Sequence, residues 1–213
     1  LLILERDLTL LEYNNCRYHI SQISSASSVE IIRERKSKVN FSCGVSINNL
    51  SLNENDIGDF KTFLKLSPPL RTEDDRNALV QGLVDETIDV IVSDHKPEDE
   101  ENKRLTFAQA ETGASGIETL LPLSLELYHN GSVKLETIIK ALTSSPAKIL
   151  KINKGNLSIG NDADFCIVDI NKPWVVRKEK LISKSKNTPI EDKKLQGKVM
   201  NTFVNGEELF KAE

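Results

Sequence analysis

Hydrophobic positions in residues 1–150 alternate between two spacings. Helical stripes, with apolar side chains about three or four residues apart, separate short apolar runs of strand length. A repeated order of strand and helix favours a β/α fold with parallel strands. The predicted elements are a helix from Leu1 to Leu11, a strand at 17–25, a helix at 25–38, a strand at 39–46, an extended run at 63–71, a helix at 71–86, a strand at 88–94, helices at 116–129 and 134–144, and a short helix opening at Pro146.

The pattern changes after residue 150. Residues 155–176 and 197–210 form short alternating runs that suit strands, and Asn205-Gly206 in the second run favours a tight hairpin turn. We therefore predict two domains: a β/α part over residues 1–150 and a small β module over residues 151–213.

Composition and charge narrow the class of protein. Of 213 residues, 38% are hydrophobic and 28% are charged, which is typical of a globular protein. The net charge of -4 gives no electrostatic reason to expect a nucleic acid or an anionic membrane as partner. Because no stretch approaches the roughly 20 apolar residues of a membrane span, we expect a cytoplasmic protein. The lysine-rich segment 178–194 is predicted to be a solvated loop.

The cysteines and the start of the chain support two further expectations. The three cysteines are far apart and include no CxxC pair, so they are interpreted as reduced packing residues: Cys16, Cys43 and Cys166. The chain starts without an initiator Met and within a helical stripe. We therefore expect it to be part of a longer protein.

The strongest candidate for chemistry is Asp94, at the end of the apolar run 88–94. In a parallel β/α fold, side chains at the carboxyl ends of the strands converge on the active site. A carboxylate there can bind a metal ion or act as a general base. The acidic run 98–101 is interpreted as a solvated loop. The alternative for Asp94 is structural, a carboxylate that caps the next helix or pairs with a nearby cation: Lys96, Lys103 or Arg104.

Two histidines have simpler interpretations than metal binding. We expect His19 to pack within or on a strand, and His129 to lie near the end of an exposed helix. Three histidines in the whole chain are too few for a multi-histidine zinc site within it.

Several segments, in order, resemble the second half of bacterial dihydroorotases of the long, type I kind. The most specific are the PPLR sequence that ends at Arg71 and the SKSxNTP sequence that begins at Ser183. The match runs over nearly all of the chain, at residues 66–97, 116–150, 155–176, 183–190 and 195–210.

The resemblance implies a fold and an activity. The fold is a metal-dependent amidohydrolase (β/α)8 barrel of the TIM type, of which about the last four strands are present, followed by part of a β-sandwich. The implied reaction interconverts dihydroorotate and carbamoyl aspartate in pyrimidine biosynthesis. Asp94 matches the aspartate that binds zinc and shuttles the proton, with histidine ligands expected upstream of this chain. Thr112 and Gly113, in the loop 111–113, match a substrate-binding loop.

Four positions depart from the family pattern. Gln22 replaces a zinc-binding histidine, and an amide is a poor zinc ligand. Ser67 replaces an asparagine that contacts substrate, and Glu98 replaces a histidine near a substrate carboxylate. The sequence Ile47-Asn48-Asn49 stands where the family has Pro-His-His.

Three functional hypotheses remain open. The first is an active dihydroorotase with a reduced or mononuclear metal site, with a homo-oligomer as one assembly that it allows. The second is a catalytically silent dihydroorotase-like subunit that partners aspartate transcarbamoylase. The third and weakest is a related cyclic amidohydrolase such as a hydantoinase or an allantoinase. In each case the 213 residues alone are expected to lack dihydroorotate hydrolysis, because the histidine ligands would lie upstream. They are also expected to be unstable or to associate, because half a barrel has open strand edges.

Overall fold

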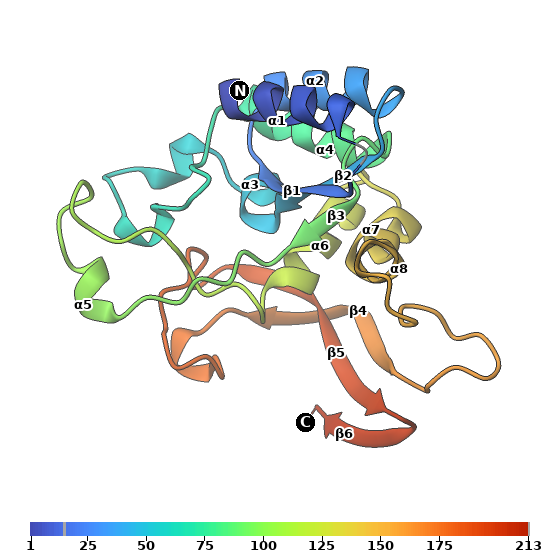
Figure 1. The fold of residues 1–213 in the computed structure, drawn as a ribbon. Coiled ribbons are helices and arrows are strands. Elements are labelled where there is room, and N and C mark those ends of the chain that lie inside the picture. The colour runs from blue at the N-terminus through green and yellow to red at the C-terminus, as the bar shows by residue number, and fades with distance from the viewer. Residues whose placement is uncertain (15, 213) are drawn as a thin grey trace.

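The computed structural model describes residues 1–14 and 16–212, and Figure 1 shows their arrangement around two sheets. The first sheet is parallel, in the order β1-β2-β3, and consists of β1 (Tyr18–Ile23), β2 (Phe41–Ser46) and β3 (Val90–Val92). The second is antiparallel, in the order β4-β5-β6, and consists of β4 (Phe165–Val175), β5 (Lys194–Val204) and β6 (Glu207–Lys211).

The helices connect and cover these strands. Figure 1 shows α1, α2 and α4 together beside the parallel sheet, with α6 between that sheet and β4–β5. The α-helices are α1 (Leu2–Tyr13), α2 (Ala26–Lys36), α3 (Ile47–Ser51), α4 (Glu73–Val84), α5 (Glu100–Lys103), α6 (Leu120–His129), α7 (Leu135–Leu142) and α8 (Ser144–Leu150). Three 3-10 helices are η1 (Glu54–Ile57), η2 (Thr62–Leu64) and η3 (Lys178–Lys180).

Local sequence signals account for the starts of α2 and α4. The Ser25 side chain accepts a hydrogen bond from the Ser28 amide at the start of α2, and Thr72 does the same for Asp75 at the start of α4. The parallel pairing of β1 with β2 and of β2 with β3 confirms the predicted β/α order with parallel strands. None of the described helices is long and apolar enough to cross a membrane.

One predicted strand is wrong. The run 63–71 contains η2 and then an irregular segment with a cis Ser67-Pro68 peptide bond. Pro68 and Pro69 have no N–H to donate to a strand partner, so this apolar run cannot continue a sheet. Within the described residues the parallel sheet consequently has three strands rather than the expected four.

The β module contains the predicted hairpin. Asn205 and Gly206 connect β5 to β6 with positive φ angles of 52° and 82°, the conformation that an Asn-Gly turn favours. The proposed domain boundary between residues 150 and 151 stays a prediction.

The core lies between the parallel sheet and its helices. Buried apolar side chains come from α1, α2, β2 and α4: Leu8, Val29, Ile32, Val45, Leu79 and Leu83. Cys43 is also buried there, and burial raises the pKa of its thiol to about 12. Cys16 and Cys166 are exposed, so the expected packing role is wrong for these two cysteines.

Candidate active site

Asp94 lies directly beyond β3, at the carboxyl end of the parallel sheet. Each of the other two strands brings one polar side chain to it. Gln22 in β1 donates its amide N–H to Asp94 Oδ1 at 3.0 Å, and Ser46 at the end of β2 donates a longer hydrogen bond of 3.5 Å to Oδ2. The strand ends therefore converge on one carboxylate, as expected for parallel strands.

Asp94 combines a positive φ angle with partial burial of its side chain. Its φ angle of 49° lies in the left-handed region, which few non-glycine residues adopt and which occurs often at functional sites. The side chain is half-buried, and this burial raises the pKa of Asp94. Hydrogen bonds from Gln22 and Ser46 and the charge of Lys96 lower the pKa and offset part of the rise.

The structural alternative for Asp94 is wrong. Each of the three cations considered as its partner is engaged elsewhere: Lys96 with Glu98 at 3.4 Å, Lys103 with backbone carbonyls, and Arg104 with Glu100 at 2.6 Å. The residue at the N-cap of α5 is Asp99. Asp94 is therefore neither an ion-pair partner of these residues nor the cap of the next helix.

The loop 111–113 lies beside the segment that follows Asp94. Ala114 forms a parallel bridge with His95, and Lys96 N donates to Ala114 O at 2.9 Å. Gly113 has a φ of 135°, and a Cβ atom there would lie 2.5 Å from the Lys96 carbonyl oxygen. Glycine is thus required by both the backbone conformation and the close approach.

The four departures from the family pattern occupy different environments. Gln22 contacts Asp94 directly. Ser67 is exposed, and its side chain makes no hydrogen bond with the rest of residues 1–14 and 16–212. Asn49 Nδ2 donates to Pro69 O at 3.0 Å, while Asn48 Nδ2 and Asn49 Oδ1 are buried without a partner among the described atoms. Glu98 has a side chain only 16% exposed, so the interpretation of 98–101 as a wholly solvated loop is wrong for Glu98.

The lysine-rich segment is not a solvated loop throughout, because its middle packs against the site. Asn187 is buried, its Nδ2 donates to Gly113 O at 3.1 Å, and its Oδ1 accepts from Ser115 Oγ at 3.1 Å. Ser185 Oγ donates to the Glu98 carbonyl at 2.6 Å. We call residues 182–188 the strap.

The start of the strap is fixed by Glu118. Its carboxylate accepts hydrogen bonds from the Ile182 amide at 2.9 and 3.0 Å and from the Ser183 amide at 3.1 Å. The many lysines of this segment favoured the prediction of a solvated loop. The small polar residues that make the contacts lie between these lysines, which are exposed or half-exposed. The SKSxNTP match was the available signal.

The remaining histidines lie where simpler roles were predicted. The half-buried His19 ring contacts Ser42 Oγ at 2.8 Å, and His129 at the end of α6 contacts the Ile170 carbonyl at 3.0 Å. Neither reaches Asp94 through these contacts.

Comparison with known proteins agrees with this architecture. The model of the Amidohydrolase family matches residues 3–209. The chain belongs to the amidohydrolase family. A curated dihydroorotase from Ehrlichia chaffeensis is 41% identical over 214 residues, which span 100% of this chain and 48% of the relative. A dihydroorotase from Acetivibrio thermocellus is 40% identical over 207 residues, which span 96% of this chain and 49% of that relative.

Solved structures support the same fold. The L-hydantoinase (dihydropyrimidinase) from Arthrobacter aurescens matches with a TM-score of 0.93 at 27% identity, over 98% of this chain and 48% of that one. The dihydropyrimidinase from Brevibacillus agri matches with a TM-score of 0.91 at 22% identity over the same shares, which supports the fold alone. The resemblance to dihydroorotases is confirmed, and this amidohydrolase chain spans about half the length of its curated relatives.

The amidohydrolase family is generally metal-dependent, so the fit of a zinc ion to these residues matters. Among the described residues, no group of three or more His, Cys, Asp or Glu side chains converges on one point. At the strand ends the side chain closest to Asp94 in role is Gln22. Its amide N–H points at the Asp94 carboxylate, and an N–H group cannot ligate a metal ion. The residues of this chain by themselves therefore do not fit zinc, which usually takes about three protein ligands in catalytic sites.

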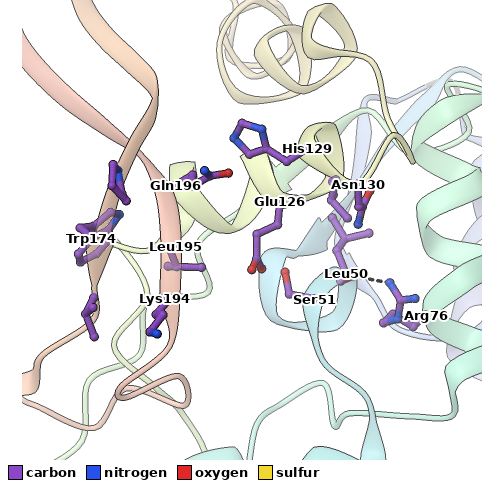
Figure 2. A pocket seen from close by; sticks show the side chains of 13 residues that line it. Leu50, Ser51, Arg76, Glu126, His129, Asn130, Trp174, Lys194, Leu195 and Gln196 are labelled. Atoms are coloured by element: carbon purple, nitrogen blue, oxygen red, sulfur yellow. Dashed lines mark hydrogen bonds between the residues drawn. The ribbon is translucent and has the colours of Figure 1, made fainter.

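A separate cavity of about 780 Å³ lies between the helices and the β module of this amidohydrolase chain. Figure 2 shows Glu126 of α6 pointing into it between Ser51 and Leu195. None of the predicted site residues lines this cavity. The candidate active site is therefore the Asp94 region at the strand ends.

Proposed function

We propose that the protein containing this chain is a dihydroorotase-type cyclic amidohydrolase. The reaction would be the reversible hydrolysis of dihydroorotate to N-carbamoyl aspartate in pyrimidine biosynthesis. The observation that carries the proposal is a half-buried Asp94 with a raised pKa at the converging strand ends, in a chain whose curated relatives are named dihydroorotase. A cytoplasmic location and a homo-oligomeric state stay predictions.

Asp94 would move the proton in this reaction. In ring opening, a water oxygen bonds to the ring amide carbonyl carbon and the carbon–nitrogen bond breaks. Asp94 accepts the proton of the water and returns it to the departing nitrogen, and ring closure reverses these transfers. A carboxyl group that burial holds nearer to its protonated form suits both directions.

Substrate binding would use the rim beside Asp94. Gly113 N is already bonded to the Lys65 carbonyl at 3.0 Å, so its amide is not free for substrate. Thr112 is the remaining residue of this pair that can contact substrate directly. Its hydroxyl oxygen accepts a hydrogen bond from Lys96 Nζ at 3.2 Å, and its O–H is proposed to donate to the substrate. Ser67 and Glu98 are proposed to complete the rim.

Zinc is proposed as the cofactor of the whole protein only. Asp94 would supply one ligand, and the others would have to come from residues outside this chain, because Gln22 is a poor substitute for histidine. No proton transfer described above is assigned to the metal.

A second candidate function is a catalytically silent subunit that partners aspartate transcarbamoylase. Two observations favour it: Gln22 donates a hydrogen bond onto the expected metal ligand, and Glu98 places a carboxylate on the rim where an anionic substrate would bind. A hydantoinase or allantoinase activity is a third candidate, supported by the likeness to the L-hydantoinase structure.

The test is ring opening of dihydroorotate by the full-length gene product, followed by loss of substrate absorbance. We expect turnover in the wild type, and in Asp94→Asn a loss of about a hundredfold or more, the size of a general acid–base contribution. Asp59→Asn, an exposed site, is the matched control and should retain activity. Stable association with aspartate transcarbamoylase without turnover would favour the silent subunit. Faster hydrolysis of hydantoin or allantoin would favour the third candidate.

A further inference from the structure

Lys103 at the end of α5 is a buried lysine whose amine bonds to backbone. Its residue surface is 2% exposed, and within residues 1–14 and 16–212 no carboxylate lies within ion-pair distance of its amine. The Nζ atom instead donates to the carbonyl oxygens of Glu111 at 2.6 Å, Thr62 at 3.2 Å and Lys65 at 3.4 Å. A buried ammonium is costly, so three carbonyl acceptors are a minimal compensation.

These carbonyls belong to two segments that meet beside the candidate site. Thr62 and Lys65 bracket η2, directly before Ser67, and Glu111 opens the loop 111–113. The Lys65 carbonyl also accepts from Gly113 N at 3.0 Å, so Lys103 and the loop share one acceptor. The Thr62 hydroxyl donates in turn to the Lys103 carbonyl. Lys103 therefore ties α5, the turn at 62–65 and the loop together.

We propose that Lys103 is a positioning residue, whose ammonium holds the turn 62–65 against the loop 111–113 and so sets the substrate-binding rim beside Asp94. The three hydrogen bonds from Lys103 Nζ to the turn and the loop are called the tie. The identity of the substrate rests on the proposed function, whereas the tie itself does not. Removing the amine leaves three carbonyls without this donor and frees the loop to move away from the rim.

The tie is also sensitive to pH. The pKa of Lys103 is lowered to about 8, mainly by burial; the charge of Glu98 opposes this shift, those of Lys96 and Lys65 add to it, and that of Glu111 opposes it. A neutral amine has two hydrogens for three acceptors. As pH rises through about 8 one hydrogen bond is lost, and the loop should loosen.

Amide hydrogen exchange of the full-length protein tests the tie without any substrate. We compare Lys103→Met with Lys36→Met, which loses an amine bonded to the Glu86 carbonyl at 3.1 Å and to Asp89. In Lys103→Met we expect exchange at the Gly113 amide to rise about tenfold, with the β5–β6 hairpin unchanged. Lys36→Met should not change Gly113 selectively. Equal changes throughout the protein, or no change at Gly113, would overturn the proposal.

Two further measurements separate the possible failures. In the wild type, exchange at Gly113, corrected for intrinsic base catalysis, should gain an extra increase above about pH 8, and this experiment needs no variant to fold. Absence of that step would contradict the tie. Turnover assays should show KM raised about tenfold in Lys103→Met with a smaller change in kcat, as expected for lost positioning. A selective effect at Gly113 in a protein without dihydroorotate turnover would support the tie and reject the proposed function.

Discussion

Two aspartates bracket β3, and their surroundings differ in kind. Asp89, before the strand, accepts hydrogen bonds from Lys36 Nζ and from the Cys43 amide, both at 2.8 Å. Asp94, after the strand, receives its hydrogen bonds from the neutral side chains of Gln22 and Ser46. A carboxylate that binds a cation and a backbone amide suits a structural contact, whereas a half-buried one whose hydrogen bonds come from neutral side chains is suited to exchange a proton. The comparison assigns a structural role to Asp89 at the amino end of β3 and a chemical role to Asp94 at its carboxyl end.

Exchanging each aspartate for asparagine should separate the two roles. Asp94→Asn should lower ring opening by about a hundredfold to ten-thousandfold without destabilising the protein. Asp89→Asn should cost about 1–3 kcal/mol of unfolding free energy, because Lys36 and the Cys43 amide lose an ionised acceptor, while activity per folded molecule remains. Denaturant titration and initial rates measure both. A large loss of activity in correctly folded Asp89→Asn would break the comparison.

Gly113→Ala tests how closely the loop must approach the segment after Asp94. The added Cβ would lie 2.5 Å from the Lys96 carbonyl at a φ of 135°, so we expect a loss of about 3 kcal/mol. Gly131→Ala is the matched control, because Gly131 also has a positive φ, 76°, but no atom within 4 Å of the added carbon. Thermal unfolding of both variants gives the answer. Equal losses would mean that backbone conformation alone matters.

Asn187→Ala tests whether the strap supports the active end of the sheet. The substitution leaves the Gly113 carbonyl without the Asn187 amide, which should cost about 2 kcal/mol. The Ser115 hydroxyl also loses Asn187 but keeps the Ser185 carbonyl at 3.1 Å. KM should also rise, because the rim loses a support. Asn153→Ala serves as the control, because Asn153 is exposed and its side chain, within residues 1–14 and 16–212, bonds only to Asn161 at 3.0 Å. If both variants behave alike in unfolding and in KM, the strap has no special role.

Sequence pattern predicts the local elements of the fold well, at both ends of the sheet. The caps at Ser25 and Thr72 and the apolar run that ends at Asp94 are local signals, readable within a few residues. The strand-end rule predicts that Asp94 lies where the strands converge, and the 3.0 Å contact between the Asp94 and Gln22 side chains agrees with it. The error at 63–71 came from weighing apolar residues above two prolines that cannot donate to a sheet.

The supports of the active end are not predictable in the same way. Asn187 bonds to Gly113 across 74 residues of sequence, and Lys103 reaches the Thr62 and Lys65 carbonyls across 41 and 38. Such contacts leave no periodic signal, and the charge of a lysine or a lysine-rich segment predicts exposure. The structure is needed to find charged and polar residues that are buried because backbone groups far along the chain bind them.

The smallest expected effect concerns stability and pH at Asp94. Burial raises the pKa of Asp94 in the folded state, so the folded protein binds more protons than the unfolded chain in that pH range. The favourable contribution of the protonated group is therefore present at low pH and is lost as pH rises through the raised pKa. Asparagine has no charge to desolvate and can still accept the hydrogen bond from Gln22.

Asp94→Asn should accordingly unfold at a slightly higher temperature than the wild type at pH 7. The difference should shrink as pH falls toward 3.8, the ordinary pKa of aspartate, because Asp94 then becomes increasingly protonated and so more like asparagine in charge. Calorimetry of wild type, Asp94→Asn and the exposed Asp59→Asn from pH 7 to pH 4 measures the trend, and the control should follow the wild type. A lower unfolding temperature for Asp94→Asn at pH 7 would mean that the ionised carboxylate stabilises this end of the sheet, as Asp89 does the other, and the distinction between the two aspartates would fail.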